Sequence, residues 1–163
     1  CLGDPEVKSV SAAAFSKLGC DIENYKYRYM WSEDTKDVNG TFDVDDSVTA
    51  IIRTEGPVIS LEGAWAQNIG ENEMFIDFMG TKGGIRLQYG KEFTLYSTKN
   101  GMLTKTTFET ENQDMFQNEI DSFVRCVQTG EKLPSHIDTN IITAEMMGAI
   151  YESAETHKEV VLG

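Results

Sequence analysis

The chain has 163 residues, which is enough for one domain with a hydrophobic core. It carries 14 Lys and Arg against 27 Asp and Glu, so its formal net charge is −13, and a surface that acidic repels the phosphates of nucleic acids. Because no run of about 18 apolar residues and no amino-terminal signal pattern is present, we expect a soluble, cytoplasmic domain without membrane contact.

The first residues resemble the end of a helix. Cys1-Leu2-Gly3-Asp4-Pro5 has no initiator Met, and an apolar residue followed by Gly and then Pro is typical of a helix's closing turn. A missing amino-terminal half is the preferred explanation, although a trimmed or processed terminus would look the same. The stretch from Val7 to Phe15 then predicts a first strand.

A long polar excursion follows from Gly19 to Phe42. In it, aromatic residues fall at every second position: Tyr25, Tyr27, Tyr29 and Trp31. Such a row can form a platform for a ligand, and it can also be the buried face of a single strand. We favour the strand face, which is the commoner arrangement.

Short runs of alternating apolar and polar residues fill the stretch from Asp45 to Thr110, and they predict an antiparallel meander. Asn100-Gly101 is its strongest hairpin signal. The turn Thr81-Lys82-Gly83-Gly84 could suggest a phosphate loop, but Ile85 to Tyr89 alternates as a strand where such a loop needs a helix. We therefore expect a hairpin corner in which glycine supplies a positive φ.

Two amphipathic helices follow the meander. The first is predicted over Gln113 to Thr129 and ends at Gly130, and the second over about Asp138 to Thr156. Their apolar stripes are Phe116, Ile120, Phe123 and Val127 in the first, and Ile142, Met146 and Ile150 in the second. A last short strand, "EVVL", closes the chain. The predicted fold class is α+β, an open, mostly antiparallel sheet with helices packed on one face.

No catalytic residue or metal site is predicted. His136 and His157 lie near helix boundaries in polar company, and no Ser-His-Asp or Cys-His arrangement can be argued from the sequence. Asp43, Asp45 and Asp46 form an acidic cluster, but neighbouring strand residues point to opposite faces. Three scattered cysteines, Cys1, Cys20 and Cys126, lack the spacing of a zinc or redox site and are expected to be reduced.

The most suggestive stretch for substrate contact is "SLEGAWAQN". Alternation places Leu61, Gly63, Trp65 and Gln67 on one side of a strand, where Gly63 leaves room for a ligand. Trp65 offers a ring for a sugar's C–H face, and Gln67, with Asn68 beside it, offers amides for its hydroxyls. Packing of Trp65 under a helix or at a subunit interface is an equally good interpretation.

Four segments in this order resemble the carboxy-terminal domain of the Gfo/Idh/MocA oxidoreductases. They are "DDSVTAIIRTEGPVISLEGAWAQN", "MFIDFMGTKGGIRL", "FQNEIDSFVRCVQTGEKLP" and "AIYESAETHKEVVL". The resemblance covers most of the chain from about Val44 to Leu162. One departure from the family's pattern is His157, which stands where a glycine is common and puts the geometry of that turn in question.

The resemblance implies a function. Residues 1–163 would be one domain, resembling the C-terminal domain of glyceraldehyde-3-phosphate dehydrogenase and forming the substrate-binding and oligomerisation half of an oxidoreductase that acts on a sugar, polyol or related hydroxy compound. The full-length protein would use NAD or NADP. The family's glycine-rich dinucleotide loop, Glu-Lys-Pro lysine and Asp-x-x-x-His helix are not in this sequence, so this chain alone should bind no cofactor and turn over no substrate. A non-catalytic binding or assembly module is the alternative, and the coding sequence upstream of Cys1 would separate the two.

Assembly is expected because both faces of the meander carry apolar residues. Met74, Ile76 and Phe78 point one way, whereas Phe75 and Met79 point the other. The two helices can cover only one face, so the other is a partner surface. The simplest partner is a second copy, sheet against sheet, which makes a homodimer or higher homo-oligomer.

Overall fold

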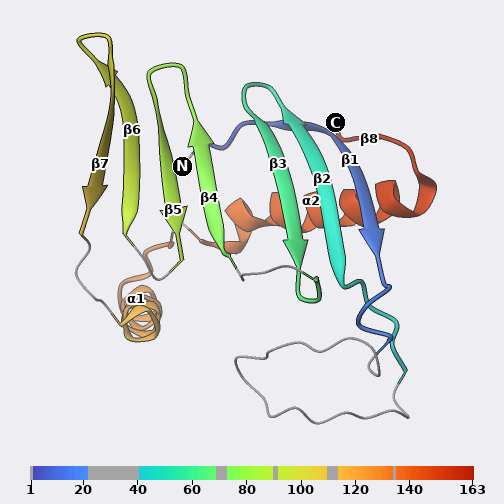
Figure 1. Cartoon of the computed structure of the whole chain (residues 1–163). Helices are drawn as coiled ribbons and strands as arrows, with labels where there is room; N and C mark the ends of the chain where they lie inside the picture. The colour runs from blue at the N-terminus through green and yellow to red at the C-terminus, as the bar shows by residue number, and fades with distance from the viewer. Residues whose placement is uncertain (1, 22–40, 69–72, 90–91, 110–113, 134) are drawn as a thin grey trace. The chain divides into compact units, whose positions relative to one another are not determined.

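The computed structural model describes residues 2–21, 41–68, 73–89, 92–109, 114–133 and 135–163 (Figure 1). The chain divides into two compact units. The first consists of Cys1–Asn68 and Pro134–Gly163, and the second of Ile69–Leu133. In the described part of the chain, neither helix combines the length and the apolar character needed to cross a membrane. The aromatic row from Tyr25 to Trp31 lies outside the described residues.

The first unit is a four-stranded antiparallel sheet with one long helix across one face (Figure 1). Its strands are β1 (Val7–Phe15), β2 (Ser47–Thr54), β3 (Val58–Ala64) and β8 (Val160–Val161), in the order β3-β2-β1-β8. The helix is α2 (Ile137–Thr156). The predicted first strand has the observed bounds, and the predicted last strand is confirmed as the short β8.

The core of the first unit lies between this sheet and α2. Period-two alternation turns Val10, Ala50 and Ile52 to the helix, and the pairing of Val10 with Ile52 sets them side by side. The helix contributes Ala149 and Ile150, and all five side chains are buried. Small residues at 50 and 149 let the helix lie close to the sheet, so this contact fixes the position of α2.

Two histidines set the ends of α2. His136 is the N-cap, and its Nδ1 accepts the backbone N–H of Asp138. His157 is the C-cap and has φ of 56°, in the left-handed region that favours glycine. The turn where the resemblance led us to expect glycine is left-handed here with histidine. The prediction that both histidines lie at helix boundaries is confirmed.

A buried serine joins α2 to the edge of the sheet. The Ser153 hydroxyl accepts the backbone N–H of Ala12 at 2.8 Å and donates to the carbonyl of Lys158 at 2.7 Å. Because β8 pairs with β1 only at Ser9 and Val10, the N–H of Ala12 lies beyond the reach of that strand. Ser153 thus satisfies a strand group that would otherwise be buried without a partner.

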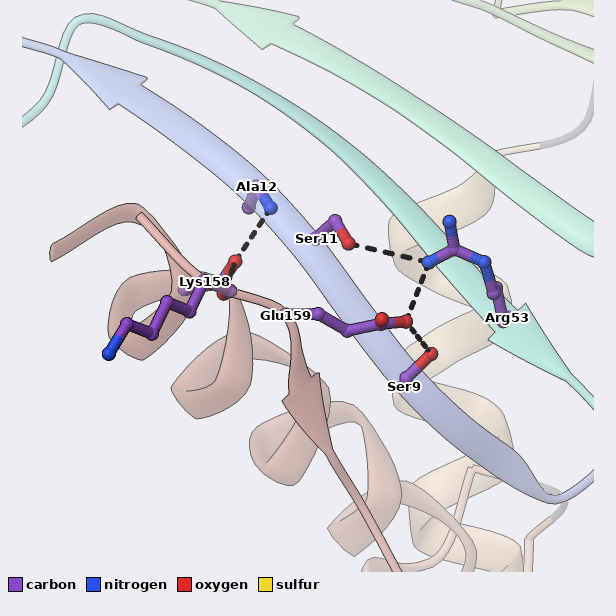
Figure 2. Close-up of polar contacts among 7 residues, drawn as sticks. Ser9, Ser11, Ala12, Arg53, Lys158 and Glu159 are labelled. Atoms are coloured by element: carbon purple, nitrogen blue, oxygen red, sulfur yellow. Dashed lines mark hydrogen bonds and ion pairs between the residues drawn. The ribbon is translucent and has the colours of Figure 1, made fainter. Parts of the chain in front are cut away.

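On the other face of β1, a carboxylate links the carboxy-terminal segment to two strands. Figure 2 shows Glu159 lying between Ser9 and Arg53, where it accepts from the hydroxyl of Ser9 and from Arg53 Nη1 at 2.8 Å. The same Arg53 nitrogen donates to the hydroxyl of Ser11. This network fastens β8 to the sheet, although β8 is only two residues long.

The second unit is a meander of four antiparallel strands followed by a helix. The strands run in chain order as β4 (Phe75–Met79), β5 (Gly83–Gln88), β6 (Phe93–Lys99) and β7 (Met102–Phe108), and the helix is α1 (Met115–Thr129). Asn100 and Gly101 both have positive φ between Lys99 and Met102, so the predicted hairpin is confirmed. The α+β class is also confirmed, with the strands divided between two sheets.

The hairpin at Gly83-Gly84 is confirmed, but the reason we gave for its glycines is wrong. Neither glycine has a positive φ; both lie in β5, after the turn. A Cβ on Gly83 would come within 2.8 Å of the Tyr96 carbonyl oxygen, and one on Gly84 within 3.0 Å of the Phe78 carbonyl oxygen. Close approach of neighbouring strands, and not backbone conformation, therefore requires glycine at these positions.

Helix α1 matches its predicted ends. Asp114 caps its amino end by accepting the N–H groups of Phe116 and Gln117, and Gly130 ends it in the left-handed conformation. Its predicted apolar stripe is exposed, which differs from the expectation that both helices cover a sheet face. Among the described residues of the second unit, none is buried.

Replacing Ser153 tests the link between α2 and β1. In Ser153→Ala, the buried N–H of Ala12 loses its acceptor, so we expect the free energy of unfolding to fall by about 2 kcal/mol. Thr156→Ala is the matched control, because Thr156 bonds only to the Glu152 carbonyl within the helix and is exposed; its effect should stay within about 0.5 kcal/mol. Urea denaturation measures both, and equal effects would contradict the assigned role.

Candidate functional site

A cleft of about 300 Å³ opens in the first unit, between α2 and the sheet. The sheet side is built by Ala14, Val48, Leu61 and Gly63, and the helix side by Met147, Ile150 and Tyr151. The chain around the β2 entrance contributes Asp45, Asp46 and Ser47, and Ala64 and Trp65 complete the wall. The lining is mainly apolar, with its polar groups gathered at the β2 entrance.

Three residues of the predicted substrate strand meet in this cleft. Leu61 and Gly63 lie on the face of β3 that α2 covers, and Trp65 follows directly after the strand. A Cβ added to Gly63 would make only an ordinary contact, 3.6 Å from Val48 Cγ1. A Cβ would therefore fit at position 63, and the contact of this position with a ligand remains a prediction.

Backbone groups at the β2 entrance hold the indole of Trp65. Its Nε1 donates to the Asp45 carbonyl at 2.8 Å, and its backbone N–H donates to the Asp46 carbonyl at 3.1 Å. The ring also packs against Phe42, with centroids 5.8 Å apart and planes tilted by 48°. The residue nevertheless stays 44% exposed, so a held aromatic surface remains open to a ligand.

Asp46 holds the backbone at this entrance through hydrogen bonds. Its side chain is buried, and Oδ2 accepts the backbone N–H groups of Lys17, Leu18 and Gly19 at 2.5, 2.6 and 3.1 Å. The hydroxyl of Ser47 donates to Oδ1 at 3.3 Å. Desolvation raises the pKa of Asp46, but the backbone hydrogen bonds together outweigh it and hold the pKa below its usual range.

The loop that Asp46 grips also touches the indole. A Cβ on Gly19 would lie 2.5 Å from Trp65 Cη2 and 2.4 Å from Phe42 Cζ, so only glycine fits between the loop and the two rings. The carboxylate of Asp46 binds the backbone of residues 17–19, and Gly19 in this loop contacts the ring of Trp65. Trp65 is thus fixed both through its backbone and through its ring face.

Sequence reasoning missed the helix wall of the cleft. The predicted apolar stripe of α2 was Ile142, Met146 and Ile150, and only Ile150 reaches the cleft. Met147 and Tyr151, spaced four residues apart on the neighbouring helix face, are both about half exposed. An aromatic residue and a methionine at i and i+4, outside the core stripe, are the signal that could have pointed to them.

The remaining sequence hypotheses stay apart from the cleft. Gln67 and Asn68 are exposed and are not among its lining residues, so their proposed contact with substrate remains a prediction. Within the described part of the chain, no cluster of three His, Cys, Asp or Glu side chains is placed to hold a metal ion. Cys20 and Cys126 are free thiols.

A second hollow, of about 350 Å³, lies on the sheet of the second unit beside Tyr96 and Gly84. Its charged groups are already paired. Arg86 donates to both carboxylate oxygens of Asp77 at 2.7 Å, and its guanidinium lies 4.3 Å from the centroid of the Phe75 ring. These contacts stabilise the sheet surface, and we assign no ligand to it.

Comparison with known proteins shows the family to which this chain belongs. Residues 18–162 match the model of an oxidoreductase family's C-terminal alpha/beta domain. D-glucoside 3-dehydrogenase of Escherichia coli K12 is 29% identical over 164 residues, which are 99% of this chain and 44% of that protein. The chain thus spans less than half the length of this relative.

Solved structures share the fold. Levoglucosan dehydrogenase in its apo form superposes with a TM-score of 0.73 at 19% identity, over 97% of this chain and 46% of that one. The WlbA dehydrogenase from Bordetella pertussis, in complex with NADH and UDP-GlcNAcA, gives a TM-score of 0.59 at 15% identity, over 97% and 39% of the two chains.

Asp46→Asn tests the electrostatic support of the cleft. An amide replaces hydrogen bonds to a charged acceptor with weaker neutral ones, so we expect the free energy of unfolding at pH 7 to fall by about 2 kcal/mol. Because folding lowers the pKa of Asp46, the wild-type advantage is full above the unfolded pKa of about 3.9 and is lost as pH falls through the folded pKa.

The matched control is Asp43→Asn, which removes an exposed carboxylate three residues away. Denaturant titrations between pH 3 and 7 measure both variants. A loss for Asp46→Asn that does not shrink toward acid pH would contradict the role of the charge.

Proposed function

The chain belongs to the Gfo/Idh/MocA oxidoreductase family as its C-terminal alpha/beta domain, and on that premise we propose that it forms the substrate side of an oxidoreductase acting on a sugar, a polyol or a related hydroxy compound. The observation that carries the proposal is the cleft of the first unit, where the indole of Trp65 is held in place and left partly exposed. The relative in Escherichia coli is named as acting on a glucoside, which supports this substrate class.

The chemistry of the cleft suits such a ligand. The face of an indole packs well against the C–H groups of a sugar ring, and the carboxylate of Asp45 and the phenol of Tyr151 can accept hydrogen bonds from hydroxyl groups. The backbone contacts that fix Trp65 reduce the ordering needed on binding. The proposed role of this chain is therefore to bind and orient the substrate.

Hydride transfer would be supplied by NAD or NADP, bound outside the residues described here. A dinucleotide pyrophosphate needs the free N–H groups of a helix that follows a strand and a glycine-rich loop. The first N–H groups of α1 already bind the carboxylate of Asp114, and Asp138 stands in the first turn of α2. The described residues do not fit the cofactor, so no step of hydride transfer is assigned to them.

We also propose that the open sheet face mediates self-association. In the first unit, the face of the sheet opposite α2 exposes Ile51 and Val58, which are 45% and 64% exposed. In the second unit, large apolar side chains such as Met79 and Leu103 are exposed as well. A second copy offers the same apolar patches, so a two-fold pairing would bury a patch on each copy.

Trp65→Ala tests the substrate role in the complete oxidoreductase that this proposal implies. Removing the ring should lower kcat/KM for the substrate at least tenfold and leave the Kd for the nucleotide within about twofold, because the two ligands use different domains. Trp65→Phe is the matched variant: it keeps an aromatic face, loses the bond to the Asp45 carbonyl, and should retain most of the activity. Equal loss of substrate and nucleotide binding would indicate a packing role.

Ile51→Glu tests the assembly proposal in the 163-residue chain. Light scattering at micromolar concentration should give at least a dimer of 18.2 kDa chains for the wild type and a lower mass for the variant, since the new charge lies on the proposed interface. Thr143→Glu adds the same charge to the exposed side of α2 and should keep the wild-type mass. A wild-type monomer would overturn the proposal.

A further inference from the structure

The interior of the Trp65 cleft offers a ligand little hydrogen bonding. Asp46 is 2% exposed, and its carboxylate already accepts three backbone N–H groups and the hydroxyl of Ser47. The Asp45 carbonyl accepts the indole N–H. A sugar hydroxyl moved into this interior would give up its bonds to water and gain few in return, which is unfavourable by about 1–3 kcal/mol for each group.

The walls of the interior are hydrocarbon instead. Val48 and Leu61 come from the sheet, and Met147 and Ile150 come from α2. Methionine is flexible and polarisable, so Met147 can adapt to groups of different shape. The volume of about 300 Å³ is at the lower end of the range for small-molecule pockets, which suits one part of a ligand better than a whole disaccharide.

The backbone conformation at position 63 does not require glycine. Its φ is not positive, and the nearest atom to an added Cβ lies at an ordinary distance of 3.6 Å, so a Cβ fits there. Its effect is to widen the cleft directly beside Leu61 and Trp65. Space, and not strand geometry, is what this glycine provides.

We propose that the interior of this cleft, bounded by Leu61, Gly63 and Ile150, receives the apolar aglycone of a glycoside. The sugar ring then lies on the exposed indole of Trp65, near the carboxylate of Asp45. The inference rests on the proposed function and narrows its substrate class from free sugars and polyols to glycosides that carry an alkyl or aryl group. Each methylene of the aglycone that leaves water tightens binding by about fourfold.

The experiment measures binding of methyl, butyl and hexyl β-D-glucosides to the 163-residue chain by saturation-transfer NMR. We expect the Kd to fall at least tenfold from the methyl to the hexyl glucoside, with the strongest transfer to the alkyl protons. In Gly63→Leu, which fills the cleft, this gain should disappear. Ser60→Leu adds the same side chain to the open face of β3 and should keep the gain.

Folding of each variant is checked by thermal denaturation. If Gly63→Leu does not fold, Gly63→Ala replaces it, since its Cβ fits without a clash, and it should reduce the gain at least threefold. Hexan-1-ol is the probe without a sugar, and it should bind more weakly than the hexyl glucoside.

Three results would contradict the aglycone inference, and they differ in whether the proposed function also fails. Equal affinity for methyl and hexyl glucosides, with both weakened by Trp65→Ala, overturns the aglycone inference and leaves the proposed function standing. A chain-length gain that Gly63→Leu and Gly63→Ala do not change also overturns the inference, because the alkyl group then binds elsewhere. No saturation transfer to any glucoside overturns the proposed function itself, and the inference with it.

Discussion

The docking of α2 on β1 is the constraint on which the first unit depends, and Ser153 is its polar centre. Beyond Val10, β1 has no neighbour on the β8 side among the described residues, so the N–H of Ala12 needs another acceptor, and the hydroxyl of Ser153 supplies it. The same hydroxyl donates to the Lys158 carbonyl and so directs the chain into β8. Ala149 and Ile150, one turn before Ser153, pack in the core, and Ile150 also lines the cleft. Because Ser153 fixes α2 one turn after Ile150, the helix is held in the position that forms the wall of the cleft.

Asp46 supplies a second acceptor for backbone N–H groups, at the point where β1 ends. The chain leaves β1 at Phe15 and must turn, which exposes the N–H groups of three consecutive residues from Lys17 to Gly19. One buried carboxylate accepts all of them and is stabilised as an anion in return. Since the backbone of Asp46 also binds Trp65, the turn that ends β1 and the aromatic wall of the cleft share one support.

Short sequence patterns predicted the features that depend on neighbouring residues, such as strand bounds, a hairpin turn and a helix end. The run of small residues from Val7 to Phe15 predicted β1, Asn100-Gly101 predicted the hairpin between β6 and β7, and Gly130 predicted the end of α1. The cleft itself needed information that no local pattern holds, because Tyr151 and Gly63 lie 88 residues apart and meet only when α2 crosses the sheet. Gly83 and Gly84 show the same limit: the sequence marks them as a turn, whereas the reason for glycine is the carbonyl groups of Tyr96 and Phe78 on neighbouring strands.

The two units differ in how they can be stable. The first buries Val10, Ile52 and Ile150 in a small core, so its cleft can be formed before a ligand arrives. The described part of the second has no buried residue, although rings such as Phe93 and Phe108 stack at 4.6 Å across its strands. A four-stranded sheet without a core gains too little from burial to offset the entropy of ordering it. The self-association proposed above would cover part of this sheet, and the free energy of that association would then be linked to the free energy of its folding.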